Sequence, residues 1–344
     1  MRRRHTLLAA CAAGGIDVDG DTLCPIIYNA FSPTGRVMNF PSCRKSVVSS
    51  AVTAALLVSG LAVRASAADL RDLPVASQSA PVPGFFDQWA ATADEARATQ
   101  PHWMTPLATV TPRLEQEFRY DQFFQHRGDG ADVTVFDGGK GLELIPTPTN
   151  EILLNLPAYT DRELRGKNTH GWSDDNFLTI KQRFISANEE NGNYIVSGFL
   201  GFQAPTGDAR YTNNAWVITP TLAAGKGWGD FDIQATVGLP IPLSQEREIG
   251  TSIVTNVVFQ YHLLKYLWPE LEFNYTHWLD GERGGRDQLY LTAGVIFGRF
   301  EIAPKVNFIV GAGYQTSVGP RLILSPAITP VYDHAVLLTT RVTF

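Results

Sequence analysis

The amino-acid sequence predicts an all-β protein, a transmembrane antiparallel up-and-down β-barrel of about twelve strands (ten to fourteen). Three observations lead to this prediction. Polar and apolar side chains alternate with a period of two through one segment after another. Short and long connections alternate along the chain, and the chain ends on a strand whose last residue is the aromatic Phe344.

The N-terminal part of the sequence predicts export of the chain. Basic residues, an apolar run and the small-residue triplet Ala65-Ser66-Ala67 follow one another within residues 38–67. This order is typical of a secretory signal peptide, and we expect cleavage before Ala68. Residues 1–37, which precede a second methionine, are interpreted as an over-extended N-terminus.

The predicted mature chain has 344 − 67 = 277 residues, with 28 − 7 = 21 basic and 34 − 3 = 31 acidic side chains and no cysteine. The resulting net charge of 21 − 31 = −10 argues against a nucleic-acid partner. An exported chain without cysteine has no disulfide framework and no cysteine-ligated zinc site. We therefore expect backbone pairing and side-chain burial to stabilise the fold.

Residues 68–110 form a leader rich in Ala, Pro, Ser and Gln, in which five prolines interrupt any long element. One short helix is expected around 86–98. The leader has two interpretations: a flexible periplasmic tail, or a segment that docks at the mouth of the following domain. Its composition favours the tail.

Residues 111–344 are predicted to form the barrel, because no stretch holds an apolar period of 3.6 residues. The clearest strand is 229–239, where Phe231, Ile233 and Val237 share one face. The expected strands are 111–123, 139–146, 149–158, 175–186, 193–203, 214–223, 229–239, 251–262, 267–279, 287–298, 304–315 and 334–344.

The connections between these strands alternate in length. The short ones are 187–192, 224–228, 263–266 and 299–303, and the long ones are 159–174, 204–213, 240–250, 280–286 and 316–333. Short periplasmic turns and longer extracellular loops are typical of outer-membrane barrels.

Two further features distinguish the predicted barrel from a soluble β-sandwich. Most segments reach the roughly nine to eleven residues that a tilted strand needs to cross a bilayer, and one face of the first strand carries a run of mixed charge.

The last strand resembles the C-terminal signal by which outer-membrane barrels are recognised for assembly. Val336, Leu338, Val342 and Phe344 share one parity of this strand. We therefore expect Phe344 to be part of an assembly signal read by the barrel-assembly machinery, with both termini periplasmic and the cell outer membrane as the location.

The alternation also predicts a belt of mixed charge in the periplasmic half of the lumen. Its expected members are Arg113, Glu115, Glu117, Arg119, Lys181, Arg183, Asp232, Glu270, Glu272 and Arg341. Arg113 and Glu115 are expected beside Arg341, where the first and last strands meet. The belt is either a selectivity filter or ligand site, or a salt-bridge network that fills a narrow barrel and makes it rigid.

No enzyme motif was found in the sequence. A nucleophile elbow, a phosphate-binding loop, a dinucleotide fingerprint, a zinc-protease helix and a calcium loop are all absent. We expect no catalytic residue, no cofactor and no metal. The alternative of an outer-membrane lipid hydrolase depends on His277, which lies on the lipid-facing parity without a recognisable serine motif.

One block of sequence indicates a family. The run from Gln100 through His102-Trp103-Met104 to Glu117, the loop Ala204-Pro205-Thr206-Gly207 and the closing strand resemble the "meta-pathway of phenol degradation" family of outer-membrane barrels, over about residues 100–344. The resemblance implies uptake of small, often aromatic, organic compounds, and it carries over no ligand residues. We expect a passive outer-membrane channel or transporter, with a hydrolase or a plugged structural barrel as the alternatives.

Overall fold

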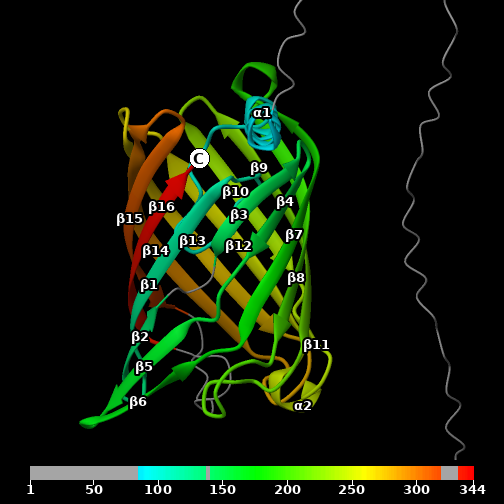
Figure 1. Ribbon diagram of the computed structural model, residues 1–344. Coiled ribbons are helices and arrows are strands. Elements are labelled where there is room, and N and C mark those ends of the chain that lie inside the picture. Colours follow the sequence, from blue (N-terminus) through cyan, green and yellow to red (C-terminus); the bar gives the residue numbers. More distant parts are fainter. Residues whose placement is uncertain (1–83, 137–139, 319–331) are drawn as a thin grey trace, which may run out of the picture. The chain divides into compact units, whose positions relative to one another are not determined.

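The computed structural model describes residues 84–136, 140–318 and 332–344, and the predicted signal peptide and residues 1–37 lie outside them. The described residues form a closed antiparallel β-barrel with neighbouring strands consecutive around the ring (Figure 1). In the order in which they pair, the twelve strands of the ring are β1 (Glu117–His126), β3 (Gly141–Thr147), β4 (Asn150–Leu154), β7 (Asp175–Ala187), β8 (Tyr194–Ala204), β9 (Val217–Trp228), β10 (Phe231–Gly238), β12 (Ser252–Tyr261), β13 (Leu267–Trp278), β14 (Asp287–Ala303), β15 (Val306–Ser317) and β16 (His334–Thr343).

The first and last strands close the ring. β1 pairs with β16 along ten residues, from Glu117 opposite Thr343 to His126 opposite His334. The predicted fold class and strand number are therefore confirmed. The predicted first strand, 111–123, is wrong at its start, because β1 begins at Glu117 and the preceding residues lie inside the barrel.

A small extension departs from the ring at one end. β2 (Asp132–Phe136) pairs with the second half of β1, β5 (Tyr159–Leu164) pairs with β2, and β6 (Lys167–Trp172) pairs with β5. This hairpin projects past the rim in Figure 1. The sequence analysis assigned 159–174 to a loop, which is wrong, because polar residues such as Lys167 and His170 concealed a short two-stranded ribbon.

The two ends of the barrel differ, and we name them by what they carry. The helix end carries α1 (Phe85–Ala98), Phe344 and tight turns such as 229–230 and 304–305. The loop end carries longer connections, which include β11 (Ile241–Pro242) and α2 (Glu246–Ile249). Neither helix in the described part of the chain is long and apolar enough to cross a membrane.

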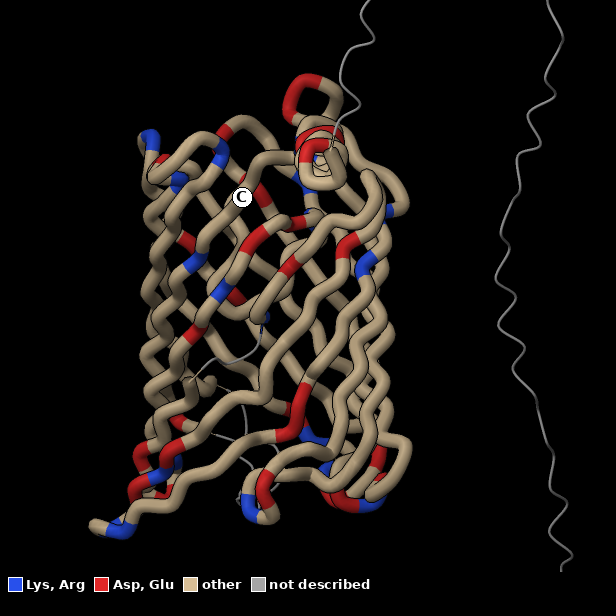
Figure 2. The backbone as a smooth tube through the Cα atoms, in the orientation of Figure 1, with Lys and Arg blue, Asp and Glu red and all other residues tan. Residues whose placement is uncertain are grey.

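Side chains alternate across the wall as the sequence predicts. In β16, Leu337, Thr339 and Arg341 are buried, whereas Val336 and Leu338 are 43% and 41% exposed on the outer face. The same alternation in β13 buries the inward acidic residues. The outer wall is therefore apolar and exposed, and the charged residues predicted as belt members in the helix-end half are buried. Along the backbone, charged residues are concentrated toward the two ends of the barrel (Figure 2).

Candidate functional site

A lumenal segment, which we define as residues 99–116, occupies the helix-end half of the barrel interior. It follows α1 directly and ends where β1 begins. Nearly all of its side chains are buried, and Met104 and Leu107 form an apolar cluster with Trp268, Ile296 and Ile309 of the wall. The interpretation of the leader as a flexible tail is therefore wrong for these residues.

Carboxylates of β13 bind the main-chain amides of the lumenal segment. Glu270 Oε1 accepts from the Leu107 N–H at 2.9 Å. The two oxygens of Glu272 accept from the Ala108 and Thr109 N–H groups, both at 2.8 Å. These hydrogen bonds fix three successive residues of the segment to one strand.

Cations of β1, β14 and β16 bind the main-chain carbonyls of the same segment. Arg341 donates to Thr105 O and Pro106 O, and Arg119 donates to Pro106 O and Leu107 O. Arg299, which the sequence analysis did not single out, donates to the carbonyls of residues 102 and 103. The wall thus binds both the amide and the carbonyl groups of the main chain of the lumenal segment.

The remaining predicted belt residues have other partners. Lys181 pairs with Glu151 at 2.9 Å with both side chains fully buried, and it also donates to Arg113 O at 2.7 Å. Arg183 donates to Ala96 O at the C-terminal end of α1. Asp232 accepts from Gln234, and the Oε1 atom of the buried Glu117 has no hydrogen-bond partner.

One predicted arrangement is wrong. Arg113 and Glu115 form an ion pair at 3.0 Å, but both belong to the lumenal segment and not to a strand. Arg341 faces Arg119 across the β1–β16 pairing and binds the lumenal segment. The alternation of polar and apolar residues continues through 111–116. These residues were therefore predicted to belong to the strand that follows them.

Glycines of the inner wall make room for two large side chains of the lumenal segment. A Cβ at Gly225 or Gly227 would collide with the indole of Trp103, and a Cβ at Gly294, Gly311 or Gly313 would collide with Leu107. None of these glycines has a left-handed backbone that would itself require glycine. Their lack of a side chain is explained by the close approach of the lumenal segment.

Amide and hydroxyl side chains of β12 to β15 form a network next to Thr109 of the lumenal segment. Asn274 donates to Asn256 Oδ1 at 3.0 Å and to Thr109 Oγ1 at 3.1 Å, while Gln315 donates to Thr292 Oγ1 at 2.7 Å. This network adjoins the charged belt at Thr109, whose carbonyl also accepts from the buried Lys140 at 2.9 Å. It can hydrogen-bond a polar solute without favouring either sign of charge.

The loop end carries a cation that sequence analysis missed. Arg283 is 1% exposed, its guanidinium lies 5.2 Å from the ring centre of Trp278, and its Nε and Nη2 atoms have no hydrogen-bond partner. Burial lowers the pKa of Arg283 to about 10. Gly281, Gly284 and Gly285 surround the arginine in the sequence, and they give no sign of its burial.

The residue of the hydrolase alternative lies outside the lumen. His277 Nδ1 is 2.6 Å from Asp287 Oδ1, which also accepts from the Tyr275 hydroxyl at 2.7 Å. In the described ranges, no serine hydroxyl hydrogen-bonds either His277 or Asp287, and no cluster of three or more metal-ligating side chains occurs.

Comparison with known proteins gives a likeness of fold only. No protein-family model matches the chain, and no curated protein matches it. Among solved structures, a COG4313 outer membrane channel from Pseudomonas putida F1 is similar with 14% identity over 66% of this chain and 94% of that one, at a TM-score of 0.43. OmpF of Salmonella typhi in complex with daunomycin is similar with 12% identity over 66% and 96%, at a TM-score of 0.34. At these identities and TM-scores, the likeness carries no functional inference.

Proposed function

We propose that this protein is an outer-membrane channel or transporter for passive uptake of small organic compounds, closed by its own lumenal segment. The observation that carries the proposal is a closed barrel with an apolar outer wall, whose polar interior holds, among the described residues, a segment clamped by its main chain at the helix end. Hydrophobic or aromatic solutes are the proposed class, which rests on the sequence resemblance. We include in the proposal export through a cleaved signal peptide and recognition of the Phe344 strand by the assembly machinery.

The clamp is suited to a closed state that can open. Its hydrogen bonds join charged side chains of the wall to main-chain groups, and water can replace each partner when the segment leaves. The segment is attached to the ring only through β1, so its displacement breaks no strand pairing. Opening therefore leaves the barrel intact.

The test is single-channel conductance of refolded residues 68–344 in a planar bilayer, with and without small aromatic acids and alcohols. We compare this chain with a variant carrying Glu270→Gln and Glu272→Gln, which weakens the clamp. The proposal expects rare current steps from the parent chain, long-lived steps from the variant, and block of these steps by solute. A variant that inserts, resists heat and stays silent would contradict it.

A second candidate is a non-conducting structural barrel. The full burial of the Lys181–Glu151 pair favours it, because a network of buried charges can make a narrow barrel rigid. Under this alternative, neutralising Arg113, Glu115 and Arg341 lowers the heat resistance of the barrel and produces no current. Current in these variants excludes it.

Catalysis is not part of the proposal. His277 and Asp287 lie on the outer face without a serine among their described hydrogen-bond partners. Release of fatty acid from phospholipid by the refolded chain, abolished by His277→Ala, would restore the hydrolase alternative.

A further inference from the structure

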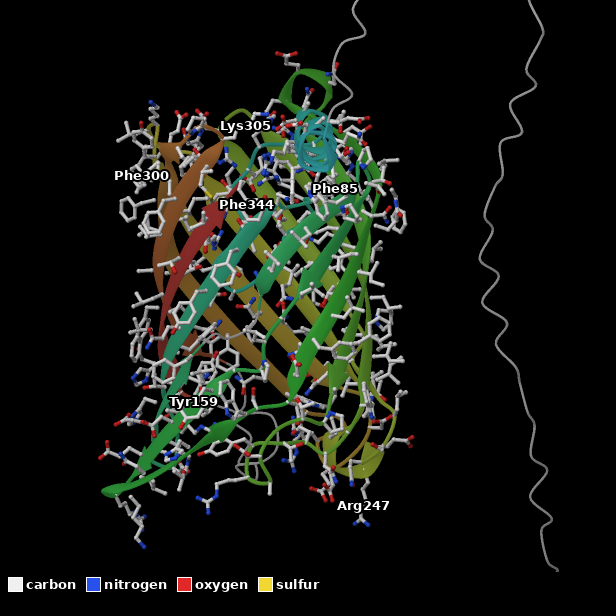
Figure 3. The ribbon with its side chains drawn as sticks, viewed as in Figure 1. Phe85, Tyr159, Arg247, Phe300, Lys305 and Phe344 are labelled. Atoms are coloured by element: carbon white, nitrogen blue, oxygen red, sulfur yellow. The ribbon has the colours of Figure 1, made fainter. Side chains whose placement is uncertain are left out.

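A cavity of about 290 Å³ lies at the helix end, between α1 and the rim of the barrel. One side of the cavity consists of residues of α1 and the other of residues from the barrel rim and the chain end. It is lined by Phe85, Phe86, Trp89, Ala90, Ala93, Asp94, Arg97, Gln116, Leu144, Lys305 and Phe344. Phe85, Lys305 and Phe344 are labelled at this end in Figure 3.

The cavity is lined by Gln116 of the lumenal segment and by residues on the outer side of the barrel wall. Leu144 lies on the outward parity of β3, whose inward residues Glu143 and Ile145 are buried. Phe344 continues the outward parity of β16 and is 38% exposed. The cavity is thus continuous with the apolar outer wall.

α1 leaves aromatic surface uncovered beside this cavity. Phe85 is 66% exposed and Phe86 is 83% exposed, although both line the cavity. Two adjacent exposed phenylalanines beside an apolar hollow are unfavourable in water. They are typical of a helix that lies in the interface between a bilayer and water.

Charged groups stand at the edge of the cavity. Lys305 Nζ is 2.6 Å from Asp94 Oδ2, and the Lys305 side chain is 65% exposed. Arg97 lies 3.7 Å from Asp94 and donates to the main-chain oxygen of Phe344. The cavity is therefore apolar within and charged at its mouth, where the exposed cation Lys305 is paired with Asp94.

We propose that this cavity binds one acyl chain of a glycerophospholipid from the periplasmic leaflet, with the lipid phosphate beside Lys305. This inference rests on the proposed location in the outer membrane. An acyl chain matches the apolar lining and a phosphate matches an exposed cation at the mouth. α1 runs directly into the lumenal segment, so a bound lipid holds the base of that segment against the rim.

Trp89 provides the probe, because it lines the cavity. The chain is reconstituted into dioleoylphosphatidylcholine vesicles with and without phosphatidylcholine brominated in mid-chain, and tryptophan emission is recorded. Subtracting the signal of Trp89→Phe gives the contribution of Trp89. A bound acyl chain brings bromine to the indole, and we expect the Trp89 emission to be quenched.

Two matched pairs of variants separate the cavity from the bilayer around it. Ala90 lines the cavity and Ala91 does not, although both are exposed on α1. We expect Ala90→Leu to fill the cavity and abolish most of the quenching, and Ala91→Leu to leave it unchanged. Lys305→Glu should weaken the quenching further than Lys265→Glu, a change in another exposed turn at the helix end.

The outcomes distinguish this inference from the proposed function. Failure of the chain to insert into vesicles, seen as full digestion by added protease, overturns both. Insertion with Trp89 unquenched overturns the lipid site alone and indicates that another occupant, such as a protein segment, covers the cavity. Equal effects of Ala90→Leu and Ala91→Leu overturn it as well, because quenching would then come from the surrounding bilayer.

Discussion

Substitution of Gly225 by alanine tests whether the lumenal segment is the gate. A Cβ at Gly225 would lie 3.0 Å from Cη2 of Trp103 and closer still to Cζ3, while Ile233 O is 3.2 Å away on the other side. The indole is rigid and only 6% exposed, so it cannot swing aside as the end of a flexible side chain can. Overpacking of this kind costs about 1–3 kcal/mol. Because the collision is absent when the lumenal segment has left the barrel, only the closed state is destabilised. The ratio of open to closed channels should therefore rise about 5- to 150-fold.

The assay is the open fraction in single-channel recordings, with two controls. Gly201→Ala adds the same methyl group to the inner face of β8, where its nearest neighbour is Thr179 Oγ1 at 3.5 Å, and should leave the open fraction unchanged. In a Trp103→Ala background, Gly225→Ala should have no further effect, because the colliding ring is gone. An equal effect of Gly225→Ala in both backgrounds would refute the assignment of the lumenal segment as the gate.

Four further predictions concern single residues. Glu272→Gln removes ionised hydrogen bonds worth roughly 1.5–3 kcal/mol each and should raise the open fraction, as measured by conductance. Burial tends to raise the pKa of Glu189, but hydrogen bonds from the backbone and ring of His102 hold it below its usual value. The contact of Glu189 with the lumenal residue His102 is therefore present at neutral pH. Protonation of Glu189 weakens it, so the open fraction should rise as the pH falls below about 4. Arg283→Met should shift the reversal potential toward cation preference and leave the open fraction unchanged. Arg97→Met should lower the temperature at which the barrel unfolds on gels, because it breaks the contact of α1 with the chain end.

The strands of the barrel could be predicted closely, because the alternation that marks each strand lies within a short stretch of sequence. Inward and outward residues alternate along each strand. The expected 193–203 differs from β8 by one residue at each end, and the expected 267–279 differs from β13 by one residue at its C-terminal end. The β5–β6 ribbon could not be found in this way. Its short strands carry charged and polar residues on both faces, so no alternation marks them.

The sequence predicted which charged residues are buried in the candidate site, but not which groups they bind. All ten belt residues are buried, eight of them on the inward parity of strands, and Arg113 and Glu115 within the lumenal segment. Their partners could not be predicted, because contacts such as Leu107 with Glu270 join residues 163 positions apart. The glycines at 225 and 294 are the one local signal of a close neighbour. A glycine within a strand has several explanations, and only the structure identifies Trp103 and Leu107 as the neighbours.

The charged belt contains both acidic and basic side chains, and this composition favours a clamp for the lumenal segment over a charge-selective filter. Selectivity filters made of side chains use rings of one sign, Asp or Glu for cations and Arg or Lys for anions. A main chain instead offers amides and carbonyls in alternation, and a wall that holds it needs carboxylates and cations side by side. Glu272 and Arg341 have these two roles on β13 and β16. The mixed sign of the belt therefore fits a main-chain clamp better than a charge filter, and Arg283→Met tests whether the separate buried cation at the loop end affects charge preference.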